Sequence, residues 1–347
     1  MGRIEIMKAA VWTGPDKIEV QNIPVPEIGA EEALIKVKVA GVCATDYHII
    51  SGKLKIGNPP NVQGHEICGV VEEINSARTD IKVGQRCVIA TSIGCGHCAY
   101  CREGKQYLCE ESSEIGFKPH NGGYAEYVKV PVSCVVPIPD SVSDHAGSIL
   151  ESCVCPTESL MRVGIPYAGS VAVIGAGPAA LAYIMVAKLL GAGKVIGLVR
   201  GSYKSELVKR YGADETVDMT SGVDVVAEVK RLTDGGADVV IEATGAGSVI
   251  SSVTDYCKKG GKIIQYGIPG DDEVVTIPVK KLVTEELTLY GAVGNTKAWY
   301  PLIEMIASGR LNVEQMVTHK FKLEDIDKAF DLYRNRSKEL IKAVIEF

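Results

Sequence analysis

The sequence predicts an α/β protein of two domains, one of which is a doubly wound parallel sheet. The chain has 347 residues, of which 46 % are hydrophobic, so it is long enough and apolar enough for two cores. Before residue 150 the apolar runs are short and irregular, whereas from residue 170 strand-like and helix-like runs alternate. We therefore expect the architecture to change between residues 150 and 170.

The first 150 residues predict an irregular β domain with few helices. Short apolar runs bounded by Gly, Pro and Asp are typical of strands joined by turns. The expected strands span residues 34–39, 69–74, 86–90 and 124–130.

The segment after residue 170 predicts a parallel sheet. Its strand-like runs carry no polar alternation and are each followed by a helical run, as in sheets covered on both faces. We expect strands at 171–174, 195–199, 215–218, 237–243 and 261–266, and helices at 178–190, up to 211–212 and at 225–232. The tail adds helices at 302–307 and 326–334 and a last strand, 343–347, that could join either domain.

Charge and hydropathy disfavour nucleic-acid and membrane partners. The net charge is −6 and no basic cluster stands out, so an extended nucleic-acid footprint is not expected. The longest apolar helical stretch, residues 179–190, contains Lys188 and is too short to cross a bilayer. Because the chain opens Met1-Gly-Arg-Ile-Glu without an apolar leader, we expect a soluble protein of the reducing cytoplasm.

A cluster of four cysteines predicts a structural zinc site. Cys95, Cys98, Cys101 and Cys109 have the spacing C-x2-C-x2-C-x7-C, and thiolates so close along the chain can surround one tetrahedral zinc at about 2.3 Å. Glycines 94, 96 and 104 permit the turns that this wrapping needs. Four thiolates leave the metal no open position, which a catalytic zinc would require.

Three other interpretations of these cysteines are weaker. Disulfides fit poorly with an odd total of 11 cysteines. An iron–sulfur run would have a shorter last spacing followed by proline, whereas Glu110 follows Cys109. Four unrelated core cysteines would not be expected to show paired C-x2-C spacing.

A second, mixed metal site is possible elsewhere. Cys43 and the pair His65-Glu66 each follow an extended run, and Glu151 lies further on. Sulfur, imidazole and carboxylate from separate segments could form a zinc site that a substrate can enter. Taken singly, each of these residues would more often be structural.

A glycine-rich turn predicts dinucleotide binding. Gly175, Gly177, Pro178 and Ala179 lie between the first expected strand and helix of the parallel sheet. There the first glycine makes the turn, the second lets the backbone approach a pyrophosphate, and proline suits the first helical turn. We also assign Thr244 and Gly267, which follow two later strands, to the cofactor site.

The end of the second strand of this sheet favours NADP over NAD. NAD-binding sheets place a carboxylate there for the ribose hydroxyl, but this chain has Val199 and Arg200, and no carboxylate before Glu206. Arg200 can bind a 2′-phosphate through two N–H groups, and Ser202 and Lys204 can add donors. The alternative to NADP binding is that Arg200, Ser202 and Lys204 are simply solvated polar residues on a loop.

The order of these motifs resembles the zinc-containing medium-chain dehydrogenases, in particular the sorbitol, polyol and threonine dehydrogenase branch. The resemblance covers essentially the whole chain. It rests on CxTDxH from Cys43, on GHE at residues 64–66, on the four-cysteine loop, on Glu151 and on GAGP from Gly175. It implies a GroES-like β-rich catalytic domain, residues 1–152 and 297–347, around a Rossmann domain, residues 153–296.

The resemblance also implies site roles. Cys43, His65, Glu66 and Glu151 would ligate or approach a catalytic zinc, which with the cysteine loop makes two zinc ions per chain. Thr45 would take the substrate proton and His48 would pass it to solvent, while Asp46 would orient His65. Thr45 could equally cap a helix that starts there. A homotetramer or homodimer is implied as well.

The implied function is reversible hydride transfer between a secondary alcohol, such as a sugar alcohol, and NADP or NAD. Departures from the branch pattern leave the substrate open: Ile49, Ser152, Asn75 and the absence of an arginine in residues 291–297. The alternatives are a threonine-type or phosphorylated-polyol dehydrogenase, a non-catalytic zinc-stabilised NADP-binding sensor, and a zinc-ribbon nucleic-acid module. The acidic balance opposes the last of these.

Overall fold

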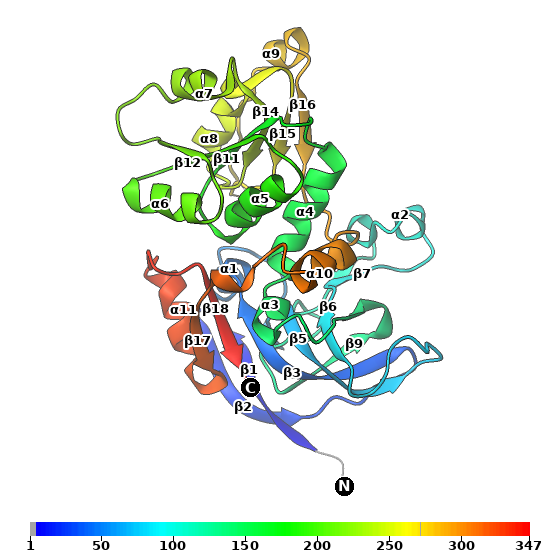
Figure 1. Ribbon diagram of the computed structural model, residues 1–347. Coiled ribbons are helices and arrows are strands. Elements are labelled where there is room, and N and C mark those ends of the chain that lie inside the picture. The colour runs from blue at the N-terminus through cyan, green and yellow to red at the C-terminus, as the bar shows by residue number, and fades with distance from the viewer. Residues whose placement is uncertain (1–4, 271) are drawn as a thin grey trace. The chain divides into compact units, whose positions relative to one another are not determined.

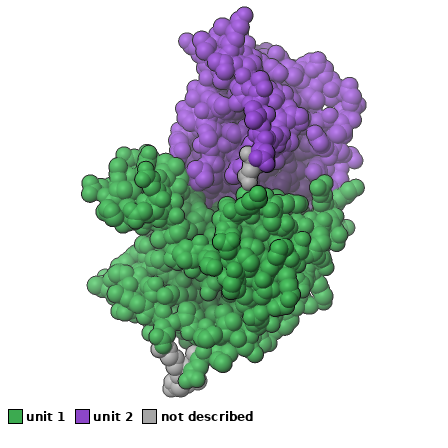
Figure 2. All heavy atoms as spheres, turned by 180° about the vertical axis from the view of Figure 1, so that it is seen from behind, with its two compact units in different colours: residues 1–151, 295–347 green, residues 152–294 purple. Residues whose placement is uncertain are grey.

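The structure is a computed structural model that describes residues 5–270 and 272–347. It divides into two compact units, Met1–Glu151 with Asn295–Phe347 and Ser152–Gly294, which Figure 2 shows in different colours. Within the described residues, no helix is both long and apolar enough to cross a membrane.

Among the described residues, the strands of the first unit pair antiparallel except for β17 and β18, which are parallel, and the unit confirms the expected β-rich domain (Figure 1). A seven-stranded sheet has the order β10-β6-β5-β3-β18-β17, with β9 paired to β3; a three-stranded sheet has the order β2-β1-β4, and β7 pairs with β8. The strands are β1 (Ile6–Gly14), β2 (Lys17–Pro24), β3 (Glu32–Val42), β4 (Asn61–Val62), β5 (Glu66–Asn75), β6 (Arg86–Ile89), β7 (Ser92–Ile93), β8 (Ser113–Glu114), β9 (Tyr127–Pro131), β10 (Val135–Pro137), β17 (Val317–Lys322) and β18 (Lys342–Glu346).

Few helices accompany these strands. They are α1 (Ala44–Ile50), α2 (Ala99–Arg102), α3 (Asp144–Ser148), α10 (Trp299–Ala307) and α11 (Ile326–Arg334). A further helix, α4 (Glu151–Val163), begins at the last residue of this unit and contains Pro156. The core is a cluster of buried aliphatic and aromatic residues, among which Tyr124 and Phe330 meet edge to face.

The strand β3 brings distant segments to one edge of the sheet. Its end pairs with β5 on one side, where Gly41 faces Glu66, and with β18 on the other, where Val42 faces Ala343. Because β5 and β18 both run antiparallel to β3, their first residues lie beside its last residues. The segments at residues 43, 65–66 and 342 therefore meet at this edge, although they are far apart in sequence.

The second unit is the doubly wound sheet that the sequence predicted. Its order is β13-β12-β11-β14-β15-β16, and all five pairings are parallel. The strands are β11 (Ser170–Ile174), β12 (Lys194–Val199), β13 (Glu215–Asp218), β14 (Ala237–Glu242), β15 (Cys257–Gln265) and β16 (Thr288–Gly291). The helices are α5 (Pro178–Leu189), α6 (Ser202–Arg210), α7 (Val225–Thr233), α8 (Gly247–Ser252) and α9 (Val279–Thr284).

The strand order fixes where a ligand can bind in this sheet. The order reverses between β11 and β14, and ligands of open parallel sheets bind outside the carboxyl ends of the strands at such a point. The residues after β11 begin with Gly175, and β14 ends at Glu242. These two strand ends therefore define the candidate cofactor edge.

Most of the elements that the sequence analysis did not predict are edge strands or short helices. The strand β17 alternates half-buried and exposed residues, a period-2 pattern that the sequence contains and that our prediction missed. The expected strand 124–130 begins at Tyr127 instead, because Tyr124 and Ala125 belong to the turn that approaches β1. The last strand joins β3 and β17, which settles its place in the first unit.

Candidate functional site

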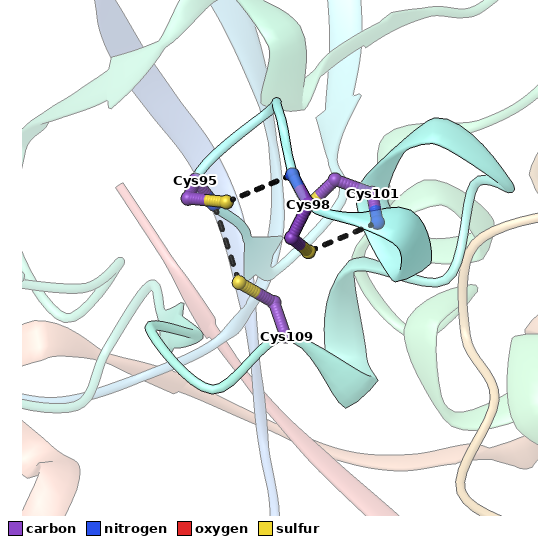
Figure 3. A group of neighbouring side chains, drawn as sticks. All are labelled: Cys95, Cys98, Cys101 and Cys109. Carbon is purple, nitrogen blue, oxygen red and sulfur yellow. Dashed lines mark hydrogen bonds between the residues drawn. The ribbon is translucent and has the colours of Figure 1, made fainter.

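The four cysteines of the loop come together around one point (Figure 3). Their sulfurs all lie within 4.8 Å of one another, and Cys98 Sγ accepts from the backbone N–H of Cys101 at 3.4 Å. The N–H groups of His97 and Cys98 lower the pKa of Cys95 to about 6, whereas burial raises the pKa of Cys101 to about 12. A cation bound by all four sulfurs would favour the thiolate at both positions.

The glycines of this loop serve two different purposes. Gly96 and Gly104 have φ of 80° and 72°, which side-chain-bearing residues rarely adopt, as the sequence predicted. Gly94 has no positive φ, and a Cβ there would lie 2.5 Å from Cys101 Sγ. The prediction that Gly94 permits a turn angle was therefore wrong. A glycine is needed there because the backbone packs closely against the Cys101 sulfur.

A second donor set lies at the edge formed by β3 and β5. Donor atoms of Cys43, His65 and Glu66 all lie within 4.8 Å of one another. Cys43 caps the N-terminus of α1 directly after β3, while His65 and Glu66 open β5. Thiolate, imidazole and carboxylate are the donors that zinc prefers, and three protein ligands leave a position for a substrate.

Asp46 connects this set to the fold. It is fully buried, its Oδ1 lies 3.2 Å from His65 Nδ1, and its Oδ2 accepts from Tyr124 Oη at 2.7 Å and from the Cys43 N–H at 3.2 Å. Burial alone would raise the pKa of Asp46, but His65, Tyr124 and the Cys43 N–H outweigh it and hold the pKa below its ordinary value. With Nδ1 engaged by a carboxylate, His65 presents Nε2 to a metal.

Glu66 is paired with a lysine that sequence reasoning did not identify. The Glu66 carboxylate contacts the Lys342 ammonium, and both side chains are almost completely buried, with 0 % and 2 % of their surface exposed. Gly41 makes room for the carboxylate, since a Cβ there would collide with Glu66. Nothing in the local sequence around Lys342 distinguishes it from a surface lysine, because its partner comes from a segment near residue 66.

Glu151 lies close to the donor set without joining it. Its Oε2 is 4.0 Å from His65 Nε2, but it is not among the three residues whose donor atoms all lie within 4.8 Å. Burial raises the pKa of Glu151 to about 7, with His65 acting in the opposite direction.

Thr45 and His48 both lie on α1, which starts at this edge. Thr45 Oγ1 is 3.5 Å from Cys43 Sγ, so the hydroxyl lies beside the candidate metal ligand. The suggestion that Thr45 caps the helix is wrong, because Cys43 occupies the N-cap and Thr45 lies within the first turn. His48 is exposed, and partial burial together with Lys53 lowers its pKa.

The second unit contains a cavity of about 220 Å³ at the carboxyl ends of its strands. Among the predicted cofactor residues, its lining includes Gly175, Val199, Arg200, Lys204 and Thr244. Sequence reasoning did not assign the other six lining residues to this site: Ile174, Ala176, Leu198, Met219, Ala246 and Val249. The cavity therefore gathers residues from β11, β12, β13 and β14.

The other predicted cofactor residues, Gly177, Pro178, Ala179, Ser202 and Gly267, do not line this cavity. Gly175 has φ of 126°, Gly177 caps α5, and Pro178 and Ala179 open the helix, as the glycine-rich turn requires. Ser202 is the exposed first residue of α6. Gly267 approaches the turn after β14, where a Cβ would lie 2.1 Å from the Gly245 nitrogen.

Comparison with known proteins identifies the family. The chain matches the family model described as alcohol dehydrogenase GroES-like domain over residues 29–140 and the model described as zinc-binding dehydrogenase over residues 178–308. It is 29 % identical over 344 residues to sorbitol dehydrogenase of Bacillus subtilis, covering 98 % of this chain and 97 % of the relative. It is 35 % identical over 322 residues to L-threonine 3-dehydrogenase of the same species, covering 90 % and 91 %.

Solved structures agree with this assignment. A protein from Sinorhizobium meliloti described as a zinc-binding dehydrogenase, solved with bound NADP, superposes with a TM-score of 0.91 at 32 % identity, over 99 % of this chain and 100 % of that one. The 2R,3R-butanediol dehydrogenase of Bacillus subtilis gives a TM-score of 0.90 at 26 % identity, over 98 % and 99 %. The resemblance seen in the motifs is confirmed: the chain belongs to the zinc-containing medium-chain dehydrogenases and is an oxidoreductase of that family.

Proposed function

We propose that the protein is a zinc-dependent dehydrogenase that oxidises a secondary alcohol, of the sugar-alcohol class, and reduces NADP in preference to NAD. The observation that carries this proposal is the set of Cys43, His65 and Glu66 donors, whose imidazole is held by the buried Asp46. A purely structural zinc would need a fourth protein ligand, and this set has three. Relatives named sorbitol and D-arabinitol dehydrogenase support the substrate class.

The residues of the first unit suit the chemistry of alcohol oxidation. A zinc ion held by Cys43, His65 and Glu66 would supply Lewis-acid polarisation of the substrate oxygen. The Thr45 hydroxyl, beside Cys43, is placed to take the alcohol proton, and the exposed His48 one turn along α1 is placed to release it to water. Asp46 keeps His65 in one tautomer throughout.

The charges around the cavity of the second unit support NADP. Arg200 and Lys204 line it, and in the part of the chain that the structure describes neither side chain forms an ion pair. The nearby carboxylate of Asp218 is engaged through Oδ1 by the Gly201 N–H at 2.9 Å, and by the Thr220 N–H and hydroxyl. Two cations that lack carboxylate partners favour a 2′-phosphate over a ribose hydroxyl.

Two zinc ions per chain and a homo-oligomer are part of the same proposal. The cysteine loop would hold the second zinc as a structural ion. The sheet of the second unit ends in β16, which exposes Leu289, and the preceding helix α9 exposes Val279 and Val283. Apolar sheet edges of this kind pair with another chain, so we propose a homodimer or homotetramer in the cytoplasm.

A substrate panel tests the proposal. Purified enzyme is incubated with sugar alcohols, simple secondary alcohols, phosphorylated polyols and amino alcohols, each with NADP and with NAD, and reduced cofactor is followed by absorbance. We expect turnover with a sugar alcohol and a higher kcat/KM with NADP. Turnover confined to threonine would instead support the activity named in the 35 % identical relative. Cofactor binding without any turnover would support a sensor and refute the enzyme.

A further inference from the structure

Glu242 is a buried carboxylate at the cofactor edge that the chemistry above does not use. It is the last residue of β14, the strand next to β11, and none of its surface is exposed. In the register of the sheet it faces Ile174, directly before the glycine-rich turn, and Gln265, the last residue of β15. A carboxylate in this position must be fully hydrogen-bonded to be stable.

Four donors satisfy the Glu242 side chain, three from the turn after β14 and one from Gln265 at the end of β15. Oε1 accepts from the Thr244 N–H at 2.7 Å and from the Thr244 hydroxyl. Oε2 accepts from the Gly245 N–H at 3.1 Å and from Gln265 Nε2 at 2.8 Å. Gln265 Nε2 also lies 2.7 Å from the Gly267 carbonyl, so the carboxylate connects the turn after β14 to the turn after β15.

The two turns are packed closely against each other. Gly245 has φ of 71°, and a Cβ there would lie 2.5 Å from the Ile268 carbonyl oxygen. A Cβ on Gly267 would lie 2.5 Å from Glu242 Oε2. The backbone N–H groups of Tyr266 and Gly267 both donate to the Glu242 carbonyl at 3.0 Å. Glu242 is thus enclosed by the turns that it joins.

One of these turns forms a wall of the cofactor cavity. Thr244 and Ala246 line the cavity together with Gly175, Val199 and Arg200. The Thr244 methyl carbon also lies 3.3 Å from where a Cβ of Gly175 would be, so Thr244 contacts the first glycine of the turn that is expected to approach the pyrophosphate. Any displacement of Thr244 would alter both the wall and this turn.

From this arrangement we propose that Glu242 is a positioning residue for the cofactor. Its carboxylate holds Thr244 and Gly245 in the conformation that completes the adenosine-binding wall, an inference that rests on the dinucleotide site of the proposed function. The role requires a carboxylate, because a glutamine has a single acceptor atom and its amide would point at two of the four donors. An unmatched buried donor costs more than a lost hydrogen bond.

Ligand binding to three variants tests this role. The probe is adenosine 2′,5′-bisphosphate, titrated calorimetrically into the full-length parent, Glu242→Gln and Asp238→Asn. Asp238 is the matched control, since it is a buried carboxylate on the same strand, bound to Ser170 and Lys258 near the opposite end. We expect Glu242→Gln to raise the dissociation constant about tenfold and Asp238→Asn to leave it within about twofold, although both lower the melting temperature.

Steady-state kinetics supply a second readout. Glu242→Gln should raise the KM for NADP with little change in kcat at saturating NADP. If Glu242→Gln cannot be purified folded, Gln265→Leu removes only the donor that ties Glu242 to Gly267, and should weaken the probe by about threefold.

The binding results distinguish a positioning role of Glu242 from general destabilisation and from the absence of a dinucleotide site. Unchanged affinity in Glu242→Gln, or in Gln265→Leu where that variant stands in, overturns the positioning role, as does equal weakening in Asp238→Asn, which would indicate general destabilisation. If the parent binds 5′-AMP as well as the bisphosphate, the NADP preference fails, yet the same comparison with 5′-AMP still tests Glu242. If the parent binds neither, the dinucleotide site and this inference both fail.

Discussion

Replacing Lys342 by methionine should destabilise the first unit strongly. The ammonium is the buried partner of Glu66, and the change removes this positive charge from beside a carboxylate with 0 % exposure. Removal of one member of a buried ion pair costs about 3–5 kcal/mol, because the remaining charge keeps its desolvation penalty without compensation. Since whole domains are stable by about 5–15 kcal/mol, this loss is a large fraction of the total.

The two tryptophans make this measurement specific to the first unit. Trp12 and Trp299 are the only tryptophans of the chain and both belong to that unit, where both are buried. Unfolding in urea, followed by tryptophan fluorescence after treatment with a zinc chelator, therefore reports the first unit. We expect Lys342→Met to lower its free energy of unfolding by about 3–5 kcal/mol.

Two further variants separate the buried pair from a general effect of losing a lysine. The double variant Lys342→Met/Glu66→Leu removes both charges and should recover most of the lost free energy. Lys320 on the neighbouring strand β17 is half exposed and lies 3.9 Å from Glu346, so Lys320→Met should cost at most about 1 kcal/mol. A loss below about 1 kcal/mol in Lys342→Met, or no recovery in the double variant, would show that the buried ion pair does not stabilise the first unit in this way.

Three other predictions concern the cysteine loop, cofactor choice and the second unit. Cys98→Ala should lower the melting temperature and remove one zinc, because a closed site contributes folding energy; a melting temperature equal to the parent's would show that the loop needs no metal. Arg200→Ala should raise the KM for NADP about tenfold with little effect on NAD, and Val199→Asp should shift preference further to NAD; equal weakening of both cofactors would contradict a 2′-phosphate site. Asp238 is nearly buried, and although burial opposes it, Lys258 and Ser170 hold its pKa below the ordinary value. Because the folded-state pKa of Asp238 is depressed, its ionised carboxylate stabilises the fold at pH values above the unfolded-state pKa of about 3.9, and this stabilisation is lost as the pH falls through the folded-state pKa. The melting temperatures of the parent and Asp238→Asn, measured by calorimetry, should therefore differ most at neutral pH and converge in acid. A difference that grows in acid would contradict that sign.

Local motifs allowed much of the site to be predicted. The four cysteines lie within fifteen residues and Gly175 is followed at once by its helix, so spacing alone gives the chemistry. The Asp46–His65 contact came from the resemblance, and the distance of 3.2 Å agrees with it. The cysteine loop and the glycine-rich turn each depend on one short segment whose conformation its own residues determine, whereas Asp46 and His65 come from separate segments.

Lys342 and Glu242 could not be predicted in the same way. Lys342 reaches Glu66 only because β18 and β5 lie on either side of β3, a pairing across most of the chain. In the sequence, Glu242 follows an apolar run and would be expected to be a solvated residue at the end of a strand. In the structure, the pairing of β14 with β15 places Gln265 beside it. For Lys342 both burial and partner come from sheet topology, whereas for Glu242 the topology supplies the burial and one partner, Gln265, beside the local donors of Thr244 and Gly245.

Metal content and turnover of Cys43→Ala distinguish an open zinc site from a closed one. The proposed dehydrogenase needs an open zinc site at Cys43, His65 and Glu66 that is separate from the closed cysteine loop. Elemental analysis should find two zinc ions per chain in the parent and one in Cys43→Ala, whose circular dichroism is unchanged and whose NADP-dependent alcohol oxidation is abolished. Parent-like turnover in Cys43→Ala, or equal zinc in the two proteins, would contradict the account.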